Sequence, residues 1–246
     1  MKKIFEKLVS FNVKLTCFCD RKFPHFVCFD SHIDKMMSLI DHFIDEKGFC
    51  RVLEAGGIDR PLLKRSEKIE YDGLDVEKND KCSELYDHFF MQSIEEPIPK
   101  TYDLIVSTSL LEHVNNNTSS LTEMYNALAP GGCIVHYIPS KYHPYSFILR
   151  STGPNVQKWL INTFRPWAKH ITGYHAYFDK CSPREMKKLS RTSGFDKIEI
   201  IPFFRANDYF RFFAPAYLLV TFWENICRRF KWVQFCSGFI LIARKQ

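Results

Sequence analysis

The sequence lacks the cysteine patterns of a disulfide-bonded or zinc-binding protein. It has no CxxC pair, and its nine cysteines are an odd number scattered along the chain. This usage is typical of a reducing compartment, where cysteine serves as a small apolar residue. Four possible zinc ligands, Cys17, Cys19, His25 and Cys28, lie close together but lack the paired spacing and glycine knuckle of a zinc site. We therefore expect no metal.

Long apolar runs and strongly basic stripes are also missing. The apolar segment at 212–223 is shorter than the roughly twenty residues that a membrane-spanning helix needs. The net charge is +6, but no basic stripe alternates with stacking aromatics, which argues against a nucleic-acid-binding module. Lysines interrupt the apolar residues of the N-terminus, so it does not read as a secretory signal. We expect a cytoplasmic protein.

Glycine is scarce, at 10 of 246 residues, and no GxGxxG motif is present. One glycine pair, Gly56-Gly57, follows a short apolar strand at 52–55 that contains Glu54. Pro61 then predicts a short helix at 61–66. A strand, a glycine turn and a helix start form a cradle in which the backbone comes close to a ligand. Glu54 would repel a pyrophosphate. This repulsion and the absence of GxGxxG both argue against a nicotinamide cofactor.

Apolar strands alternate with amphipathic segments through most of the chain. We expect strands at 52–55, 69–75, 88–91, 102–107, 133–139, 198–203 and 238–243, and helices at 31–47, from Ser120 to about Leu128, and at 182–193. This alternation predicts a parallel sheet covered by helices on both faces. The second strand ends in Asp75, 21 positions after Glu54, where a carboxylate either accepts both hydroxyls of a ribose or caps a turn.

The expected domain organisation is an N-terminal helical extension, 1–47, followed by a main domain, 48–246. The extension begins with a basic amphipathic helix at 1–14, which either packs on the domain or contacts a membrane surface. The main domain carries an aromatic and basic insert at 140–180, of the size of a functional loop or lid. A second, apolar helical insert at 206–232 closes the substrate pocket, anchors the chain at an interface or forms a dimer surface. The oligomeric state stays open.

Five blocks in order resemble class I S-adenosylmethionine-dependent methyltransferases, in the group with small-molecule and lipid-intermediate members. The blocks are VLEAGGID, YDGLDVE, YDLIVSTSLLEHVNN, ALAPGG and SPREMKKLSRTSGF. The resemblance implies a doubly wound, seven-stranded, mostly parallel sheet of the Rossmann-like methyltransferase fold, with the last strand antiparallel and inserted between the fifth and sixth. The first block departs from the family pattern, since Ile58 and Arg60 stand where later glycines are usual.

The resemblance also implies S-adenosylmethionine as cofactor and a set of residues that bind it. Glu54 suits the cationic α-amino group, Asp75 the ribose, and Ser107 lies at the methionine end. The cofactor-binding candidates are Glu54, Gly56, Gly57, Asp75, Val76, Gln92, Ser93 and Ser107. Gln92 and Ser93 offer polar groups to the adenine amine.

Methyl transfer to oxygen needs a general base, and two histidines are candidates. His113 lies in the LLEHV block and His143 follows the fifth strand; either could instead hold local structure, and His136 is expected to be buried. The expected function is O-methylation of a small or amphipathic acceptor, such as a lipid-linked sugar or an isoprenoid precursor. A methyltransferase fold that only binds or scaffolds, and a nicotinamide-dependent oxidoreductase, are the alternatives.

Overall fold

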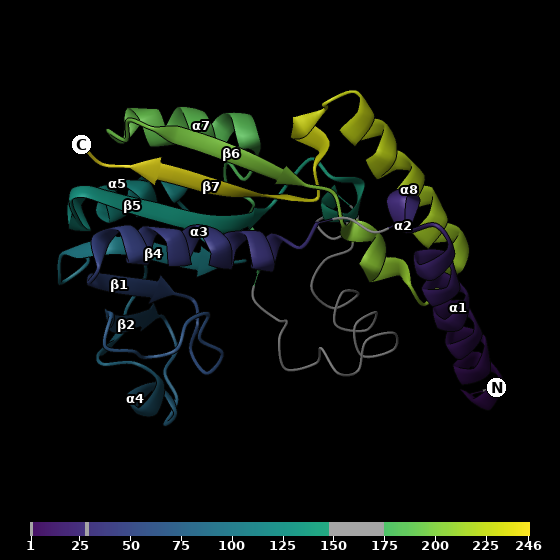
Figure 1. Cartoon of the computed structure of the whole chain (residues 1–246), viewed down its shortest axis with the longest axis horizontal. Coiled ribbons are helices and arrows are strands. Elements are labelled where there is room, and N and C mark those ends of the chain that lie inside the picture. The colour runs from purple at the N-terminus through teal and green to yellow at the C-terminus, as the bar shows by residue number, and fades with distance from the viewer. Residues whose placement is uncertain (1, 28–29, 148–174) are drawn as a thin grey trace. The chain divides into compact units, whose positions relative to one another are not determined.

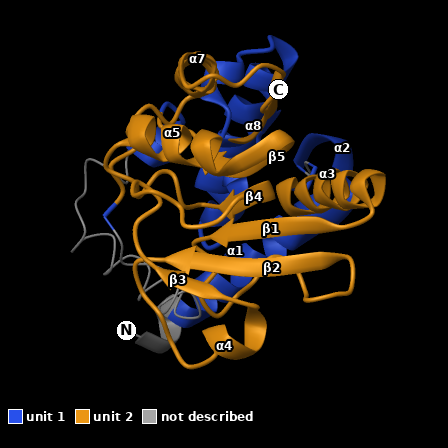
Figure 2. Cartoon of the chain, turned by 90° about the vertical axis from the view of Figure 1, so that its left-hand side faces the viewer, with its two compact units in different colours: residues 1–31, 142–175, 202–238 blue, residues 32–141, 176–201, 239–246 orange. Residues whose placement is uncertain are grey.

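The structure, a computed structural model, describes residues 2–27, 30–147 and 175–246. The chain divides into two compact units (Figure 2). The first unit gathers residues 1–31, 142–175 and 202–238, and the second gathers 32–141, 176–201 and 239–246. The domain boundary expected after residue 47 stays a prediction. Residues 148–174 of the expected aromatic insert lie outside the described residues.

The second unit is built on a seven-stranded sheet with the order β3-β2-β1-β4-β5-β7-β6 (Figure 1). Its strands are β1 (Cys50–Ala55), β2 (Ile69–Asp75), β3 (Phe89–Met91), β4 (Tyr102–Thr108), β5 (Leu128–Pro139), β6 (Ile198–Phe203) and β7 (Gly238–Arg244). Strands β1 to β5 pair in parallel. The doubly wound fold expected from the sequence is confirmed.

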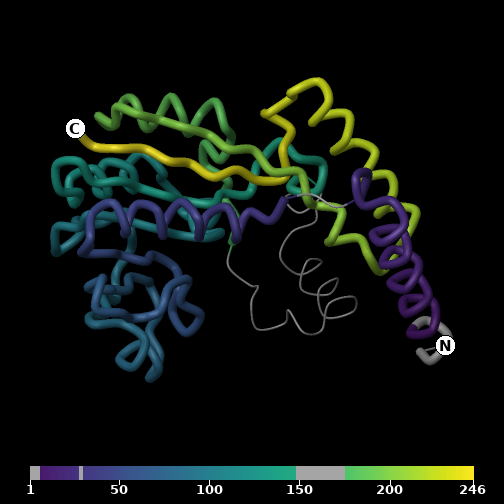
Figure 3. The backbone as a smooth tube through the Cα atoms, viewed as in Figure 1, coloured from purple at the N-terminus to yellow at the C-terminus, as the bar shows by residue number. Residues whose placement is uncertain are grey.

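The last strand runs antiparallel to both of its neighbours. The N–H of Gly131, near the start of β5, donates to the carbonyl of Lys245, just past the end of β7, at 3.0 Å. On the other side, the N–H of Asp196, just before β6, donates to the carbonyl of Arg244 at 3.0 Å. Figure 3 shows the yellow C-terminal segment lying between β5 and β6. Both the inserted position and the antiparallel direction were predicted.

Helices cover the sheet where their apolar sides match its buried strands. Helix α3 (His32–Lys47) buries Met36, Ile40, Phe43 and Ile44, and its first residue stacks on Tyr137 of β5 with ring centroids 3.7 Å apart. Helices α5 (Asn117–Ala127) and α7 (Pro183–Thr192) pack against each other. Figure 1 shows α3 in front of the sheet and α5 behind it. A short helix, α4 (Cys82–Leu85), precedes β3.

Two helix starts test the sequence signals for capping. Ser182 caps α7, as expected, and its hydroxyl accepts the N–H of Glu185 at 3.4 Å, with proline in the first turn. The predicted start of the preceding helix at Ser120 is wrong. Asn116 is the cap of α5, since its side-chain oxygen accepts the N–H of Thr118 at 3.0 Å.

The first unit is helical in its described residues. It contains α1 (Lys2–Lys22), α2 (Pro24–Val27), η2 (Ala206–Phe210), α8 (Ala214–Arg229) and η3 (Val233–Phe235). The expected end of the first helix at Lys14 is wrong, because apolar residues continue at helical spacing beyond it and the helix runs on to Lys22. Among the described helices, none combines the length and the apolar content that crossing a bilayer requires.

Candidate functional site

The carboxyl ends of β1, β2 and β3 meet at one edge of the sheet. The N–H of Gly56, directly after β1, donates to the carbonyl of Leu74 at 2.9 Å. Asp75 pairs with Met91 of β3, and the N–H of Gln92 donates to the carbonyl of Asp75 at 3.0 Å. The structure therefore brings together the glycine turn, the acid at the end of β2 and the loop after β3, as the sequence predicted. In open α/β sheets this edge is where ligands bind.

The two glycines of the turn are needed for different reasons. Gly56 has a φ of +86°, a left-handed conformation that favours glycine, and its Cα faces Leu110 of the loop after β4. Gly57 has no room for a side chain: a Cβ there would collide with the Tyr86 hydroxyl and lie 2.7 Å from Cδ of Glu54. The turn thus lies directly on the Glu54 carboxylate.

The helix predicted at 61–66 is wrong. No helix joins β1 to β2, and the chain runs through turns and bends up to residue 68. Within this segment the N–H of Leu62 donates to the Glu54 carboxylate, at 2.9 and 3.1 Å from its two oxygens. Ile58, which stands where the family has a glycine, has a φ of +42°. A β-branched residue in this region is strained, so the missing glycine leaves a local cost.

Glu54 is buried beneath the turn. Its carboxylate accepts hydrogen bonds from Leu62 N–H, from the Tyr71 hydroxyl and, at 3.5 Å, from the Tyr86 hydroxyl. Burial raises the pKa of Glu54 to about 7, although these hydrogen bonds act in the opposite direction. Glu54 therefore fastens the glycine loop to β2. Its predicted contact with an α-amino group stays a prediction.

Asp75 is the acid that the edge presents. It is half-buried at the end of β2, and its Oδ1 accepts the N–H of Glu77 at 3.0 Å. Partial burial raises the pKa of Asp75. Next to it, Val76 is 59% exposed. A carboxylate beside an exposed apolar side chain suits a ribose joined to a flat base.

Gln92 and Ser93 shape the loop that follows β3. The Gln92 side-chain amide donates to the carbonyl of Pro97 at 3.0 Å. The Ser93 hydroxyl accepts the N–H of Glu95 at 3.2 Å. Both side chains thus close their own loop, and their binding roles stay predictions.

Ser107 lies inside the sheet rather than at its edge. Strand β4 continues to Thr108, and the buried Ser107 hydroxyl lies 2.7 Å from Nδ1 of His136 on β5. Burial lowers the pKa of His136 to about 3, so this imidazole is neutral. The expectation that His136 is buried is confirmed. The predicted role of Ser107 toward the cofactor stays a prediction.

The loop between β4 and α5 holds a buried acid next to His113. Glu112 is buried, and its Oε2 has no hydrogen-bond partner among the residues that the structure describes. Burial raises the pKa of Glu112 to about 8. Nε2 of His113 lies 3.7 Å from Oε1 of Glu112. The sequence analysis missed Glu112, although it directly precedes His113 in the LLEHV block.

His143 belongs to the first unit and forms a buried pair there. Its Nδ1 accepts the N–H of Tyr145 at 3.1 Å, so the ring proton is assigned to Nε2, which lies 3.5 Å from Oε1 of Glu224 on α8. Both side chains are buried. These contacts hold the start of the 142–147 segment against α8. A catalytic role for His143 stays a prediction.

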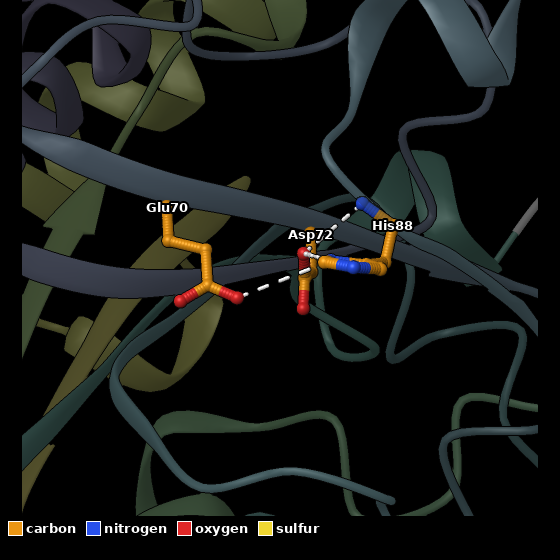
Figure 4. Close-up of side chains that lie close together, drawn as sticks. All are labelled: Glu70, Asp72 and His88. Carbon is orange, nitrogen blue, oxygen red and sulfur yellow. Dashed lines mark hydrogen bonds and ion pairs between the residues drawn. The ribbon is translucent and has the colours of Figure 1, made fainter.

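One cluster in the described residues has the composition of a metal site. Glu70, Asp72 and His88 place ligand atoms within 4.8 Å of one another (Figure 4). However, Nζ of Lys100 lies 3.0 Å from Glu70, 2.9 Å from Asp72 and 2.8 Å from Nδ1 of His88. The Tyr102 hydroxyl also donates to Asp72, at 2.9 Å. The lysine ammonium thus occupies the position that a metal cation would take.

Cys28, one of the four possible zinc ligands in the N-terminal segment, lies outside the described residues.

Comparison with solved structures finds the same fold at low sequence identity. Phosphoethanolamine N-methyltransferase 2 of Haemonchus contortus, in complex with S-adenosyl-L-methionine, matches with a TM-score of 0.51 and 12% identity over 86% of this chain. This chain spans about half of that protein, 52% of its length. A putative sarcosine dimethylglycine methyltransferase of Galdieria sulphuraria matches with a TM-score of 0.50 and 14% identity, over 87% of this chain and 84% of the other.

The family assignment comes from the sequence itself. No curated protein matches the chain. A family model described as a methyltransferase domain matches residues 29–200, well over half of the chain. This range includes the glycine turn, the acid at the end of β2 and the loop after β4. The chain therefore belongs to the methyltransferase-domain family, as the five sequence blocks predicted.

Proposed function

We propose that this chain transfers the methyl group of S-adenosylmethionine to an oxygen atom of a small or amphipathic acceptor. The observation that carries the proposal is the position of Asp75. Its carboxylate lies at the carboxyl end of β2, beside the glycine turn of β1 and the loop after β3. A ribose-binding acid belongs at this place in the fold.

The residues at this edge fit the nucleoside part of the cofactor. Asp75 would accept the ribose hydroxyls, and the exposed side chain of Val76 would lie against the adenine. The glycine turn at Gly56, with Leu110 packed against it, would border the methionine part. When bound, the cofactor supplies a methyl group that is already activated on a sulfonium. The chain then has to align the acceptor and exclude water.

The pair Glu112 and His113 supports an oxygen acceptor. A hydroxyl must lose its proton as its oxygen takes the methyl group, and His113 would receive that proton as general base. The buried Glu112, whose pKa burial raises to about 8, lies 3.7 Å from Nε2 of His113 and would orient the imidazole. Such a pair would be of no use for an acceptor that carries no proton to remove.

An amphipathic acceptor, such as a lipid-linked sugar or an isoprenoid precursor, is supported by the apolar side chains that the first unit exposes. Leu219 and Phe222 of α8 are examples. Among the described cysteines no disulfide is formed, which supports a cytoplasmic location.

Labelled extracts test this proposal. The chain is incubated with methyl-labelled S-adenosylmethionine and either a lipid extract or an aqueous extract of cells. We expect label in the lipid extract, and release of that label as methyl iodide by hydriodic acid, which cleaves O-methyl groups and leaves C-methyl groups. Label confined to the aqueous extract would contradict an amphipathic acceptor and leave a small soluble one, and label retained through the acid would contradict an oxygen acceptor.

The base is tested separately. His113→Gln should lower kcat by about 10²- to 10⁴-fold and leave the KM for S-adenosylmethionine unchanged. Asn115→Ala, in the exposed part of the same loop, is the matched control. Full activity of the His113 variant would remove the base from the proposal but not the methyl transfer.

A further inference from the structure

Helix α1 packs with its polar side inward and its apolar side outward. Its buried positions include Asn12 and Thr16. Its exposed positions include an apolar stripe, defined as Leu8, Phe11, Leu15 and Phe18, which are 57%, 61%, 38% and 52% exposed. Intervals of three and four residues place these four side chains on one face of the helix. An amphipathic helix of a water-soluble domain has the opposite arrangement.

Specific hydrogen bonds fix this orientation of α1 against α8 and η2. The N–H of Ala214, at the start of α8, donates to the side-chain oxygen of Asn12 at 3.0 Å. Asp20 accepts bonds from the Tyr217 hydroxyl and from the guanidinium of Arg211. Buried polar groups that are satisfied in this way specify one packing. The polar contacts of α1 with its neighbours therefore place the apolar stripe on the outside. The stripe is exposed even though the helix has partners.

Helix α8 repeats the arrangement. Its buried positions include Tyr217, Thr221 and Glu224, whereas Leu219 and Phe222 are 70% and 57% exposed. The Thr221 hydroxyl accepts a bond from the side-chain amide of Asn207 in η2 at 3.1 Å. Figure 1 shows α1 and α8 side by side, and contacts join them. Two neighbouring helices thus share a polar interface and each exposes large apolar side chains.

Polar contacts between helices combined with apolar outer faces are the pattern of helices in lipid. These helices do not have the length and apolar content to span a bilayer. A helix of this kind lies in the plane of the membrane surface, with its apolar face in the boundary between headgroups and acyl chains.

The charges and aromatic rings of the first unit fit an anionic surface. Exposed basic side chains accompany the apolar ones: Lys7, Lys14, Arg21 and Lys22 on α1, and Arg228, Arg229 and Lys231 at the end of α8. The ring centroids of Trp223 and Trp232 lie 6.3 Å apart, and both rings pack with Phe235. Tryptophan and basic residues are enriched where a protein meets lipid headgroups. Each basic residue near an anionic surface adds attraction.

We infer that the first unit binds the surface of an anionic lipid bilayer, with the apolar stripe of α1 and the exposed residues of α8 in the acyl boundary. The unit then holds the sheet-bearing unit at the membrane, where an amphipathic acceptor is available. This inference stands apart from the methyl transfer, because its residues belong to the first unit and the cofactor residues belong to the second.

Vesicle flotation with the full chain tests the inference. We expect the chain to float with vesicles of phosphatidylcholine and phosphatidylglycerol and to stay unbound with phosphatidylcholine alone. Phe11→Ser with Phe18→Ser should weaken binding by about 100-fold or more, since two phenylalanines that would enter the acyl boundary are lost. Lys14→Gln with Lys22→Gln should weaken it roughly 30-fold. Phe49→Ser removes an exposed aromatic of the second unit and should change nothing.

A second variant and a second measurement keep the test decisive. Leu219→Ser acts on α8 alone, so it separates loss of the apolar face from misfolding of α1. Binding of S-adenosylhomocysteine, measured without vesicles, reports on the second unit independently. Failure of the wild type to float with anionic vesicles would overturn the inference, as would unchanged flotation of the phenylalanine variant. If the chain were a dimer in vesicle-free buffer and Phe11→Ser with Phe18→Ser dissociated that dimer, the apolar face would belong to a second copy. This result would also overturn the inference.

Discussion

At the scale of single residues, burial gives several side chains properties that their positions in the sequence do not reveal. Asp75 could be placed from the sequence, because an acid at the end of the second strand is a local feature. The burial of Glu54 under the glycine turn could not, because it depends on Tyr71 and Tyr86, 17 and 32 positions away. The half-buried Asp75 and the buried Glu54 look alike in the sequence, since both follow apolar residues of a strand.

Glu112 should make the stability of the fold depend on pH. Its pKa is raised from 4.5 to about 8, so between these values the folded chain keeps a proton that the unfolded chain releases. The free energy of unfolding should therefore fall as pH rises through this window, by at most about 1.4 kcal/mol per pH unit. Glu112→Gln should flatten this dependence in urea unfolding between pH 7 and 8.

The wild type and the Glu112 variant are compared between pH 7 and 8 because Glu54, with a pKa of about 7, contributes in the same direction at lower pH. Glu96→Gln, at an exposed acid, serves as control and should keep the wild-type dependence. An unchanged slope in the Glu112 variant would show that this carboxyl is not held in its protonated form.

Gly57 should be among the least replaceable residues of the turn. In Gly57→Ala the new Cβ would meet the Tyr86 hydroxyl and the Glu54 carboxylate, so the loop must move. We expect thermal or urea unfolding to show a loss of about 1–3 kcal/mol. Gly48→Ala is the control, because Gly48 has a left-handed φ but open space around it, and it should cost only about 1 kcal/mol. Equal losses would contradict the close approach at Gly57.

At the scale of elements, the sequence predicted the strands of the sheet to within two residues, since each is a short apolar run, except that β5 starts at Leu128, five residues before the predicted start. It failed where a contact outside the element decides the local conformation. The helix expected at 61–66 does not form, and the N–H of Leu62 donates to the Glu54 carboxylate from a segment of turns and bends. Likewise, α5 starts at Asn117 because Asn116, and not Ser120, supplies the capping oxygen.

The lysine-centred cluster of β2 gives a prediction at this scale. Asp72 is fully buried and depends on the Lys100 ammonium, the Tyr102 hydroxyl and the backbone N–H of His88 for compensation. Lys100→Met should lower the free energy of unfolding by about 2–4 kcal/mol, somewhat less than for a wholly buried pair because Lys100 is partly exposed. Lys68→Met breaks an exposed pair with Asp45 and should leave the free energy of unfolding nearly unchanged.

The stability of the same cluster should not depend on metal ions. Because the Lys100 ammonium already contacts all three acidic and imidazole groups, neither added zinc nor a chelator should shift the Tm. A chelator-dependent drop in Tm that Asp72→Asn abolishes would show instead that a cation competes with the lysine.

At the scale of the whole molecule, the sheet and the family were predictable but the composition of the first unit was not. The five blocks follow one another along the chain and define the parallel sheet. The first unit joins α1 to α8, which are about two hundred positions apart, through contacts such as Asn12 with Ala214. Contacts over such separations leave no local pattern in a single sequence. The sequence predicted an amphipathic helix at 1–14, but neither the apolar stripe of α1, which continues to Phe18, nor the side on which it lies.

The central claim is that the edge formed by β1, β2 and β3 binds the nucleoside of S-adenosylmethionine through Asp75. Titration calorimetry with S-adenosylhomocysteine tests it most directly, on the wild type, on Asp75→Ala and on Asp80→Ala, an exposed acid of the same loop. The wild type and the Asp80 variant should bind alike, and the Asp75 variant should bind at least about 100-fold more weakly, since two charge-assisted hydrogen bonds are lost. Full affinity in the Asp75 variant, or no binding by the wild type, would contradict the account.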